Sequence, residues 1–372
     1  MLTTGISNMD STGLELTETA CAARPTEPIR KSHLDSPDPV VLCTTDERYA
    51  MPLAVTLSSA AEQLPVGRSM CVYLVDAGLS SESRHQLHAS LAPHPVELNF
   101  VPADAAELGG LSISHHISHT AYLRLLADRW LPSDLQRVIY LDSDLLVRDS
   151  LTELWSAELG DHAVLAVPDI ACPFVNARFG CRNYRKASPY LACLSPVQNH
   201  RQLGLAADSL YFNSGVMVMN LDRWRRERLG EQMLECLRAN REHIWCWDQY
   251  ALNVVLAGRW GRLPLRWNVG THAFEYPSLA CAPLEQAEFA ESLQRPAVFH
   301  FTTEFKPWLY RSNHPLREQF FAALDQTAWR GWRPEKPHFN LSRWWQRQAV
   351  RIAKRWTISY RKLAAWRVPE PI

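Results

Sequence analysis

Residues 137–155 read R-V-I-Y-L-D-S-D-L-L-V-R-D-S-L-T-E-L-W, and they say more about the fold than any other stretch. After Arg137 the apolar run is continuous up to Leu141, which is typical of a buried central strand. The strand stops at two carboxylates, Asp142 and Asp144, which Ser143 separates. Ligands of open α/β sheets bind beyond the carboxyl ends of the strands. The sequence therefore predicts a polar site directly after this strand.

The segments on both sides alternate between short apolar runs and longer helical stretches, which indicates an α/β domain with a largely parallel sheet. The strands are expected at 40–44, 70–76, 96–101, 137–141, 163–167, 211–220 and 297–301, and the helices at 49–63, 82–91, 120–130, 222–239 and 248–256.

Three regions are expected along the chain. Residues 1–36 are rich in Ser, Thr, Glu and Pro without an apolar period, which favours a disordered extension. Residues 37–335 form the main domain, and residues 336–372 form a basic, Trp-rich helical region. Within the domain, residues 171–210 lack periodicity. They fit a lid beside the site as well as a plain surface insertion.

The composition excludes some classes of function. Lys plus Arg equal Asp plus Glu at 39 each, which does not favour a nucleic-acid partner. The nine cysteines include no C-x-x-C pair, so a reducing compartment fits best. We see neither a signal-peptide pattern nor an apolar run of about 18 residues. We therefore expect a cytoplasmic protein.

The two carboxylates are the first candidates for chemistry. Asp142 and Asp144 can face one cation, and hard oxygen ligands suit Mn²⁺ or Mg²⁺. The Asp-x-Asp spacing by itself favours a surface turn over a metal site. An aspartyl phosphatase is disfavoured because Leu146 stands where that pattern wants Thr or Val.

Three histidines near the site are a weaker metal candidate. His115 and His119 have the i, i+4 spacing of a zinc pair, with His116 between them. No set of cysteines or carboxylates accompanies them. We interpret this segment as a polar loop at the rim of the pocket.

Further segments resemble one known family in the same order. They are T-T-D-E-R-Y-A (44–50), T-A-Y-L-R-L (120–125), the stretch 137–155, Y-F-N-S-G-V-M-V-M-N-L-D-R-W-R (211–225), W-D-Q-Y-A-L-N (247–253) and H-F-T-T-E-F-K-P-W (300–308). Over roughly residues 38–310 the chain resembles glycosyltransferase family 8, retaining enzymes that include glycogenin and bacterial lipopolysaccharide galactosyl- and glucosyltransferases. The resemblance implies a single Rossmann-like nucleotide-sugar-binding domain of GT-A type, with a mixed, mainly parallel sheet.

The resemblance also implies roles for single residues. Asp142, Asp144 and His300 would hold the metal. The nucleotide and the rest of the donor would contact Thr44, Asp46, Tyr49, Arg124, Ser143, Asn213, Ser214 and Lys306. Asp169, Asp248 and Gln249 would lie near the sugar carbon that reacts, and Gln249 is a poor nucleophile, which favours front-face attack by the acceptor.

Two positions depart from the family pattern. Tyr250 replaces the second Asp of D-Q-D, and Thr303 stands where family members usually have Gly. A glycine would let the backbone approach a phosphate closely. The threonine therefore bears on the path of this loop and on donor affinity.

Together these features predict a Mn²⁺- or Mg²⁺-dependent hexosyltransferase. It would move glucose or galactose from a UDP-sugar to a glycan acceptor, such as lipopolysaccharide, another surface saccharide or a lipid-linked saccharide. Two alternatives stay open: a non-catalytic sugar-nucleotide-binding scaffold, and a nucleotidyltransferase, which also combines an α/β fold with metal carboxylates.

The C-terminal region has its own pattern. Eight basic and no acidic residues lie between Arg343 and Arg367. Apolar residues recur at helical steps at Trp345, Ala349, Ile352, Trp356, Leu363 and Trp366. This is typical of an interfacial helix on anionic lipid, here at the inner face of the cytoplasmic membrane. A helix packed on its own domain, or a homo-oligomer contact, also fits.

Overall fold

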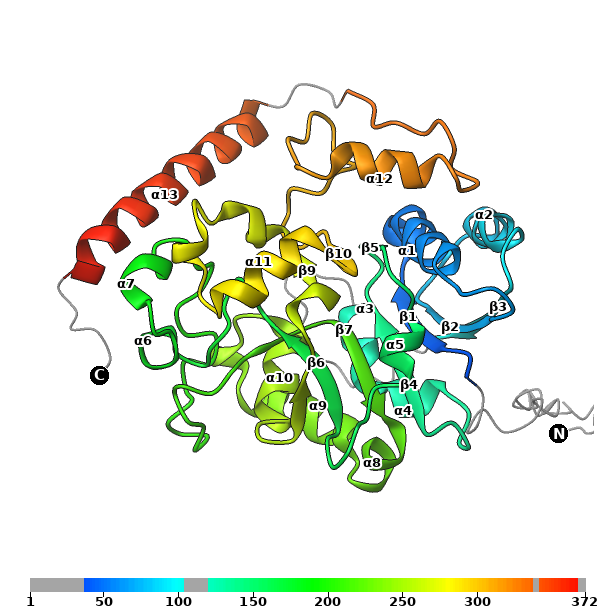
Figure 1. The fold of residues 1–372 in the computed structure, drawn as a ribbon, viewed down its shortest axis with the longest axis horizontal. Coiled ribbons are helices and arrows are strands. Elements are labelled where there is room, and N and C mark those ends of the chain that lie inside the picture. The colour runs from blue at the N-terminus through cyan, green and yellow to red at the C-terminus, as the bar shows by residue number, and fades with distance from the viewer. Residues whose placement is uncertain (1–36, 104–119, 337–340, 367–372) are drawn as a thin grey trace, which may run out of the picture. The chain divides into compact units, whose positions relative to one another are not determined.

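The computed structural model describes residues 37–103, 120–336 and the helix 341–366. These residues all lie within one compact unit, residues 33–372. A seven-stranded sheet forms its centre, with the order β3-β2-β1-β4-β7-β6-β8 (Figure 1). The expected extension 1–36 and the histidines 115, 116 and 119 lie outside the described residues.

Except for β8, which was not expected, the strands of this sheet are close to those expected from the sequence. They are β1 (Val40–Thr45), β2 (Met70–Asp76), β3 (Val96–Pro102), β4 (Arg137–Leu141), β6 (Val164–Pro168), β7 (Phe212–Asn220) and the short β8 (Trp260–Arg262). Strands β3, β2, β1 and β4 are parallel, and β8 is parallel to β6. β7 is antiparallel to both β4 and β6. The prediction of a mixed, mainly parallel sheet is confirmed.

The reversed direction of β7 has a consequence for the site. Leu141, the last residue of β4, pairs with Val216, and Pro168, the last of β6, pairs with Phe212. The first residues of β7 therefore lie at the same edge as the carboxyl ends of its two neighbours.

A second, three-stranded sheet continues from the site. It consists of β5 (Leu145–Val147), β10 (Val298–His300) and β9 (Val269–Gly270), with β10 in the middle. β10 is antiparallel to β5, and His300 is the register partner of Leu145. This pairing places His300 beside Asp144, although 156 residues of chain separate the two.

Helices cover both faces of the large sheet. α1 (Ala50–Glu62) and α2 (Ser81–Leu91) lie next to each other on one side, and α8 (Leu221–Arg226), α9 (Leu229–Ala239) and α10 (Trp247–Val255) lie on the other (Figure 1). The shorter or later helices are α3 (Thr120–Leu123), α4 (Ala127–Trp130), α5 (Thr152–Trp155), α6 (Ala177–Gly180), α7 (Tyr184–Ala187), α11 (Gln286–Gln294), α12 (Arg317–Leu324) and α13 (Leu341–Trp366).

Two expected helices are interrupted. The predicted helix 222–239 breaks between α8 and α9, where Arg228 adopts φ 52°. A left-handed residue cannot continue a right-handed helix. The predicted helix 120–130 consists of α3 and α4 with the 3₁₀ turn Arg124–Leu126 between them.

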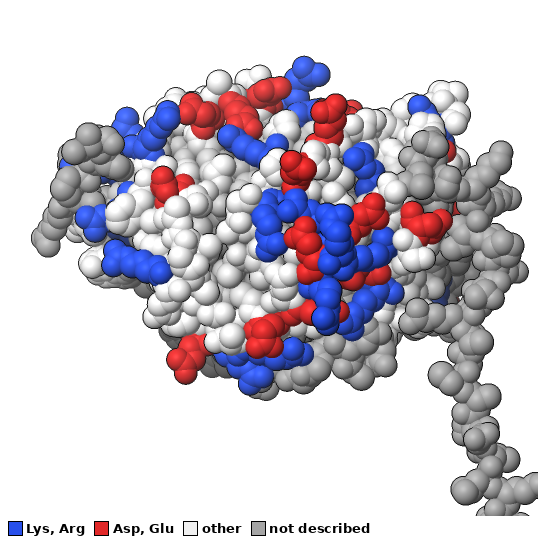
Figure 2. All heavy atoms as spheres, turned by 90° about the horizontal axis from the view of Figure 1, so that it is seen from below, with Lys and Arg blue, Asp and Glu red and all other residues white. Residues whose placement is uncertain are grey.

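The surface around α8 and α9 carries charges of both signs. Arg259 binds Glu227 at 3.0 Å, and Arg129 binds Glu231 at 3.0 Å. Figure 2 shows basic residues next to acidic ones on this face. A nucleic-acid surface is instead a patch or stripe of one sign. This face does not have that property.

Residues 171–210 pack on the domain through a small apolar cluster. Val175, Val197, Tyr211 and Tyr250 are buried together there. The hydroxyl of Tyr250 donates to Asn199 Oδ1 at 2.8 Å. Tyr250, which departs from the family pattern, therefore holds this insertion against α10.

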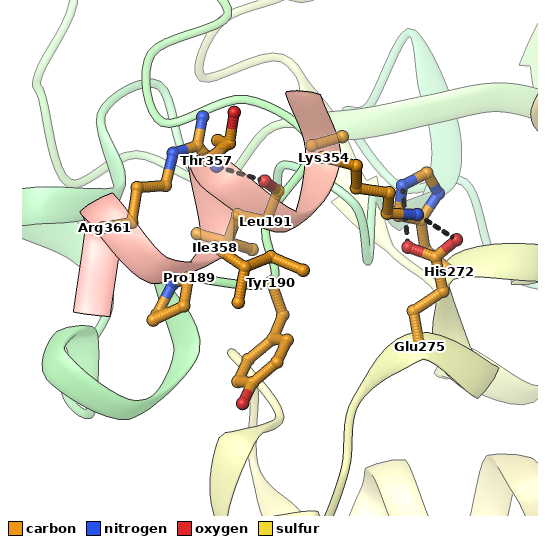
Figure 3. A pocket seen from close by; sticks show the side chains of 10 residues that line it. Pro189, Tyr190, Leu191, His272, Glu275, Lys354, Thr357, Ile358 and Arg361 are labelled. Atoms are coloured by element: carbon orange, nitrogen blue, oxygen red, sulfur yellow. Dashed lines mark hydrogen bonds and ion pairs between the residues drawn. The ribbon is translucent and has the colours of Figure 1, made fainter. Parts of the chain in front are cut away.

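The C-terminal helix α13 lies against the same insertion and against the turn 271–275. Lys354 pairs with Glu275 at 2.7 Å, and Arg361 donates to the carbonyl of Leu191 at 2.5 Å (Figure 3). A cavity of about 400 Å³ lies between α13, residues 189–192 and the pair His272 and Glu275. Within the described residues, no helix combines the length and apolar character needed to span a membrane.

Candidate functional site

Polar side chains from four strands meet at the carboxyl edge of the large sheet. Asp142, Ser143 and Asp144 follow β4, Thr44 lies near the end of β1, and Asp169 follows β6. Asn213 and Ser214 join them because β7 begins at this edge. The hydroxyl of Ser143 donates to the carbonyl of Thr44 at 2.9 Å and so ties β4 to β1.

Asp142, Asp144 and His300 form one cluster of metal-ligand type. Their ligand atoms all lie within 4.8 Å of one another. His300 Nε2 is 3.2 Å from Asp144 Oδ1 and 3.6 Å from Asp142 Oδ2. Both Asp144 and His300 are buried. The three side chains expected at the metal are therefore together.

Each carboxylate is fixed through the oxygen that does not face His300. Asp142 Oδ1 accepts from Tyr140 Oη at 3.0 Å and pairs with Arg124 at 2.8 Å. Asp144 Oδ2 pairs with Lys306 Nζ at 2.6 Å. The remaining oxygens, Asp142 Oδ2 and Asp144 Oδ1, point to the imidazole. Two carboxylate oxygens and one imidazole nitrogen suit a divalent cation such as Mn²⁺.

Lys306 is the cation of this cluster. Burial opposes the charge on both partners, yet Lys306 holds the pKa of Asp144 well below its ordinary value. In the same way, Asp144 outweighs burial and raises the pKa of Lys306. The ion pair is thus charged at neutral pH. An ammonium at this place can stabilise charge that develops on a departing phosphate.

A pocket of about 280 Å³ opens beside the carboxylates. It is lined by Thr44, Thr45, Asp46, Arg48, Tyr49, Thr120, Ala121, Arg124, Asp142, Ser143 and Asp144. The Tyr49 ring stands edge-on to Trp308, with 6.1 Å between the ring centres. An aromatic wall with polar groups around it suits a flat nucleobase.

Arg124 connects the pocket to the polar side chains of Asp248 and Ser214. Its buried guanidinium contacts Asp142 at 2.8 Å, Asp248 at 3.1 Å and the carbonyl of Ser214 at 3.1 Å. Burial disfavours its charge, but the two carboxylates raise the pKa of Arg124 above the ordinary value. For Asp248, burial raises the pKa in spite of Arg124. Arg124 therefore fixes both acids in place.

Gln249 is held at both ends of its amide. Its Nε2 donates to Asp169 Oδ2 at 2.8 Å, and its Oε1 accepts from the backbone N–H of Ser214 at 3.2 Å. Asn213 Nδ2 donates to the same Asp169 oxygen at 3.1 Å. Ser214 Oγ also lies 3.4 Å from Asp248 Oδ2, so Asp169, Asn213, Ser214, Asp248 and Gln249 form one hydrogen-bonded group.

The backbone of Thr303 has a conformation that threonine rarely adopts. Its φ is 76°, in the left-handed region. Such a conformation costs a β-branched residue about 1–3 kcal/mol, whereas glycine adopts it freely. Thr303 Oγ1 accepts from the backbone N–H of Phe305 at 3.3 Å. The structure thus gives a physical reason why glycine would suit this position.

Three residues of the site were not predicted from the sequence. Gly215 lies in the segment 211–225, where no role was assigned to it. A Cβ at this position would lie 2.3 Å from His300 Cε1 and 2.9 Å from Asp142 Oδ2. Tyr140 stood in the apolar strand β4. Asn268 precedes β9 and contacts His300 Nδ1 at 2.9 Å. The sequence around Asn268 holds no motif that would single it out.

Comparisons with known proteins agree with this geometry. The model of glycosyl transferase family 8 matches residues 40–312. General stress protein A of Bacillus subtilis is 24% identical over 78% of this chain and 94% of its own length. The glycosyltransferase GlyF of Streptococcus pneumoniae is 22% identical, and the match spans 77% of this chain and 61% of GlyF.

Solved structures show the same fold. The galactosyltransferase LgtC, in complex with donor and acceptor sugar analogues, superposes with a TM-score of 0.64 at 24% identity. That match covers 80% of this chain and 98% of LgtC. The bifunctional glycosyltransferase WbbM gives a TM-score of 0.65 at 22% identity, over 83% of this chain and 52% of WbbM.

Proposed function

Because this chain belongs to glycosyltransferase family 8 and is therefore a hexosyltransferase, we propose that it transfers glucose or galactose from a UDP-sugar to a glycan, with retention of configuration. The observation that carries the proposal is the cluster of Asp142, Asp144, His300 and Lys306 next to an aromatic-walled pocket. That arrangement suits a nucleoside diphosphate whose charge is neutralised from two sides.

In this proposal the donor lies across the carboxyl edge of the sheet. Asp46 and Tyr49 hold the nucleobase side, and Asp142, Asp144 and His300 hold Mn²⁺ or Mg²⁺. When bound, such a cation neutralises charge on the diphosphate. Lys306 adds a second positive charge at the same place, and Arg124 keeps Asp142 and Asp248 in position.

The sugar end faces the group around Gln249. In front-face attack, the acceptor hydroxyl oxygen forms a bond to the anomeric carbon while the bond from that carbon to the β-phosphate oxygen breaks. The hydroxyl proton passes to the departing diphosphate. Gln249 and Asp248 orient the sugar, and their oxygens stabilise the positive charge on its ring. Asp169 holds the Gln249 amide in place.

The function is tested with a panel of UDP-sugars and Mn²⁺, with release of UDP as the readout. We expect slow hydrolysis of UDP-glucose or UDP-galactose by the full chain, and its loss in Asp144→Ala. Asp222→Ala, an exposed acid on α8, is the matched control and should keep the activity. Unchanged turnover in Asp144→Ala would sink the metal assignment.

The same assay separates the alternatives. A nucleotidyltransferase would release pyrophosphate instead of UDP. A sugar-nucleotide-binding scaffold would bind the UDP-sugar tightly and release nothing, with or without acceptor saccharides.

We further propose that α13 rests on an anionic membrane surface, at the inner face of the cytoplasmic membrane. Ile352, Trp356, Tyr360 and Leu363 form an exposed apolar stripe along the helix. Exposed Arg355 and Lys362 flank it. Tyr360 extends the series expected from the sequence, whereas the side chains of Trp345 and Trp366 lie outside the described ones. A lipid-linked acceptor would then be close to the site.

A further inference from the structure

A row of buried amides connects Asp169 to His300. Asn213 Nδ2 lies 3.1 Å from Asp169 Oδ2, and Asn213 Oδ1 lies 2.8 Å from Asn268 Nδ2. Asn268 Oδ1 in turn lies 2.9 Å from His300 Nδ1. Asn268 is only 5% exposed. Four residues from four separate parts of the chain thus form one hydrogen-bonded row.

The direction of each hydrogen bond in this row is determined by its surroundings. Asp169 accepts from Gln249 Nε2 at 2.8 Å and from the N–H of Ala171 at 2.9 Å, so it acts as an acceptor. It therefore takes the NH₂ end of Asn213. Independently, the N–H of Gly215 can only donate, and it points to Asn213 Oδ1 at 3.0 Å. Both neighbours select the same orientation of the Asn213 amide.

The orientation of the Asn213 amide determines that of the Asn268 amide, which in turn determines the tautomer of the His300 imidazole. Because Asn213 Oδ1 accepts, Asn268 must present its NH₂ end to it. Asn268 Oδ1 then faces His300, and an amide oxygen can only accept. The proton of the neutral imidazole must accordingly reside on Nδ1. Nε2 is left with a free lone pair, and Nε2 is the atom that faces Asp142 and Asp144.

We propose that Asp169, Asn213 and Asn268 form an amide relay that sets the tautomer of His300 and so keeps Nε2 available as a metal ligand. Asn268 is the positioning residue of this relay. With the other tautomer, Nε2–H would donate to Asp144 at 3.2 Å and occupy the oxygen that the cation needs. The inference rests on the proposed metal site and extends it to Asn268, which lies behind His300 on the Nδ1 side.

The tautomer can be measured directly. Long-range ¹H–¹⁵N correlation spectra of the metal-free full chain, under mildly alkaline conditions, show which ring nitrogen carries the proton, and His300→Gln identifies the His300 signals. We expect Nδ1–H in the wild type and a shift toward Nε2–H in Asn268→Ala. Nε2–H in the wild type, alone or together with Nδ1–H, or no change in Asn268→Ala, would overturn the proposal.

Metal affinity is the second readout. Loss of such an outer partner weakens metal binding about 10–100-fold. We expect a loss of that size for Mn²⁺ in Asn268→Ala, measured by calorimetry. Asn199→Ala is the matched control, because Asn199 is an equally buried amide that binds Tyr250 and Asn240 instead. It should lose stability and keep both the tautomer and the Mn²⁺ affinity.

The two measurements distinguish a failure of the proposed metal site from a failure of the relay. A wild-type chain with Nδ1–H that binds no Mn²⁺ would sink the proposed metal site and still support the relay. A chain that binds Mn²⁺ equally well with and without Asn268 would overturn the relay and leave the metal site intact.

Discussion

At the scale of single residues, Gly215 sets how closely β7 approaches the metal ligands. The site has no room for a side chain there, because a Cβ would lie 2.7 Å from His300 Nδ1 and 2.9 Å from Asp142 Oδ2. The carbonyl of Gly215 also accepts from the N–H of Asp142 at 2.9 Å, so the backbone cannot easily withdraw. Glycine is required here for space and not for φ.

We therefore expect Gly215→Ala to displace His300 and Asp142 and to weaken Mn²⁺ binding at least about tenfold, as loss of a ligand-orienting contact does. Calorimetric titration with Mn²⁺ measures the effect. Gly270→Ala is the matched control: its Cβ would meet Thr302 Oγ1 at 3.2 Å, which needs only a small movement. Equal Mn²⁺ affinities in both variants would contradict the steric account.

Thr303 allows a second test at this scale. Thr303→Gly relieves the positive φ, whereas Thr303→Ala keeps the strain and loses the hydrogen bond from Phe305. We expect the free energy of unfolding of the glycine variant to exceed that of the alanine variant by about 1 kcal/mol. Urea denaturation compares the two. An alanine variant as stable as the glycine variant would show that φ is unstrained.

Single residues also show where sequence reasoning reaches its limit. Asp142, Asp144 and Lys306 were predictable because each stands in a motif with recognisable neighbours. Asn268 was not, because its contacts are to Asn213 and His300, 55 and 32 residues away. An isolated asparagine gives no sign of such partners.

At the scale of elements, the strand positions followed from apolar runs, but the direction of β7 did not. A continuous apolar strand has the same sequence pattern whether it pairs parallel or antiparallel to its neighbours. That direction decides whether Asn213 and Ser214 lie at the active edge or at the far edge. Only the family resemblance placed them correctly.

The element with the most direct test is α13. Replacing Trp356 and Leu363, exposed by 72% and 71%, with glutamate removes the apolar contact and adds charge. Each buried side chain of this size contributes about 1.5–3 kcal/mol, so we expect binding to anionic vesicles to fall well over tenfold. Cosedimentation measures it. Val66→Glu, at a fully exposed residue outside α13, is the control.

Release of UDP in solution should stay unchanged in the α13 variant, since none of the stripe residues lines the pocket or belongs to the cluster of metal-ligand type. If the double variant binds vesicles as well as the wild type does, the stripe is not the membrane contact. Binding should also weaken at high salt, because the cations beside the stripe are screened.

At the scale of the whole molecule, the site depends on segments brought together from distant parts of the chain. β10 supplies His300 to β5, and the loop after β10 supplies Lys306 to Asp144. The sequence predicted both residues and the strand 297–301, which contains β10, but it could not show the second sheet, since β5 and β9 have only three and two residues. Such short strands leave no periodic signal.

His314 lies in the packing behind this second sheet and makes stability depend on pH. Its Nδ1 accepts from the N–H of Leu316 at 3.1 Å, and its Nε2 lies 3.1 Å from Thr271 Oγ1. The Thr271 hydroxyl donates to the carbonyl of Thr302 at 3.0 Å, so it accepts from Nε2–H. A second ring proton would oppose the Leu316 N–H. Burial and the charge of Lys306 accordingly lower the pKa of His314 from 6.5 to about 4.

Because the unfolded chain binds this proton near pH 6.5 and the folded chain only near pH 4, the unfolded state holds more protons between these values. The free energy of unfolding should therefore fall by up to about 3 kcal/mol as the pH drops through that range. Above pH 6.5 the full stabilising contribution of neutral His314 is present. Urea midpoints as a function of pH measure this slope. In His314→Gln, which has no ring to titrate, the slope should be shallower, whereas His85→Gln, at an exposed position of α2, should retain it. Equal slopes in the wild type and in His314→Gln would assign the acid sensitivity to other groups.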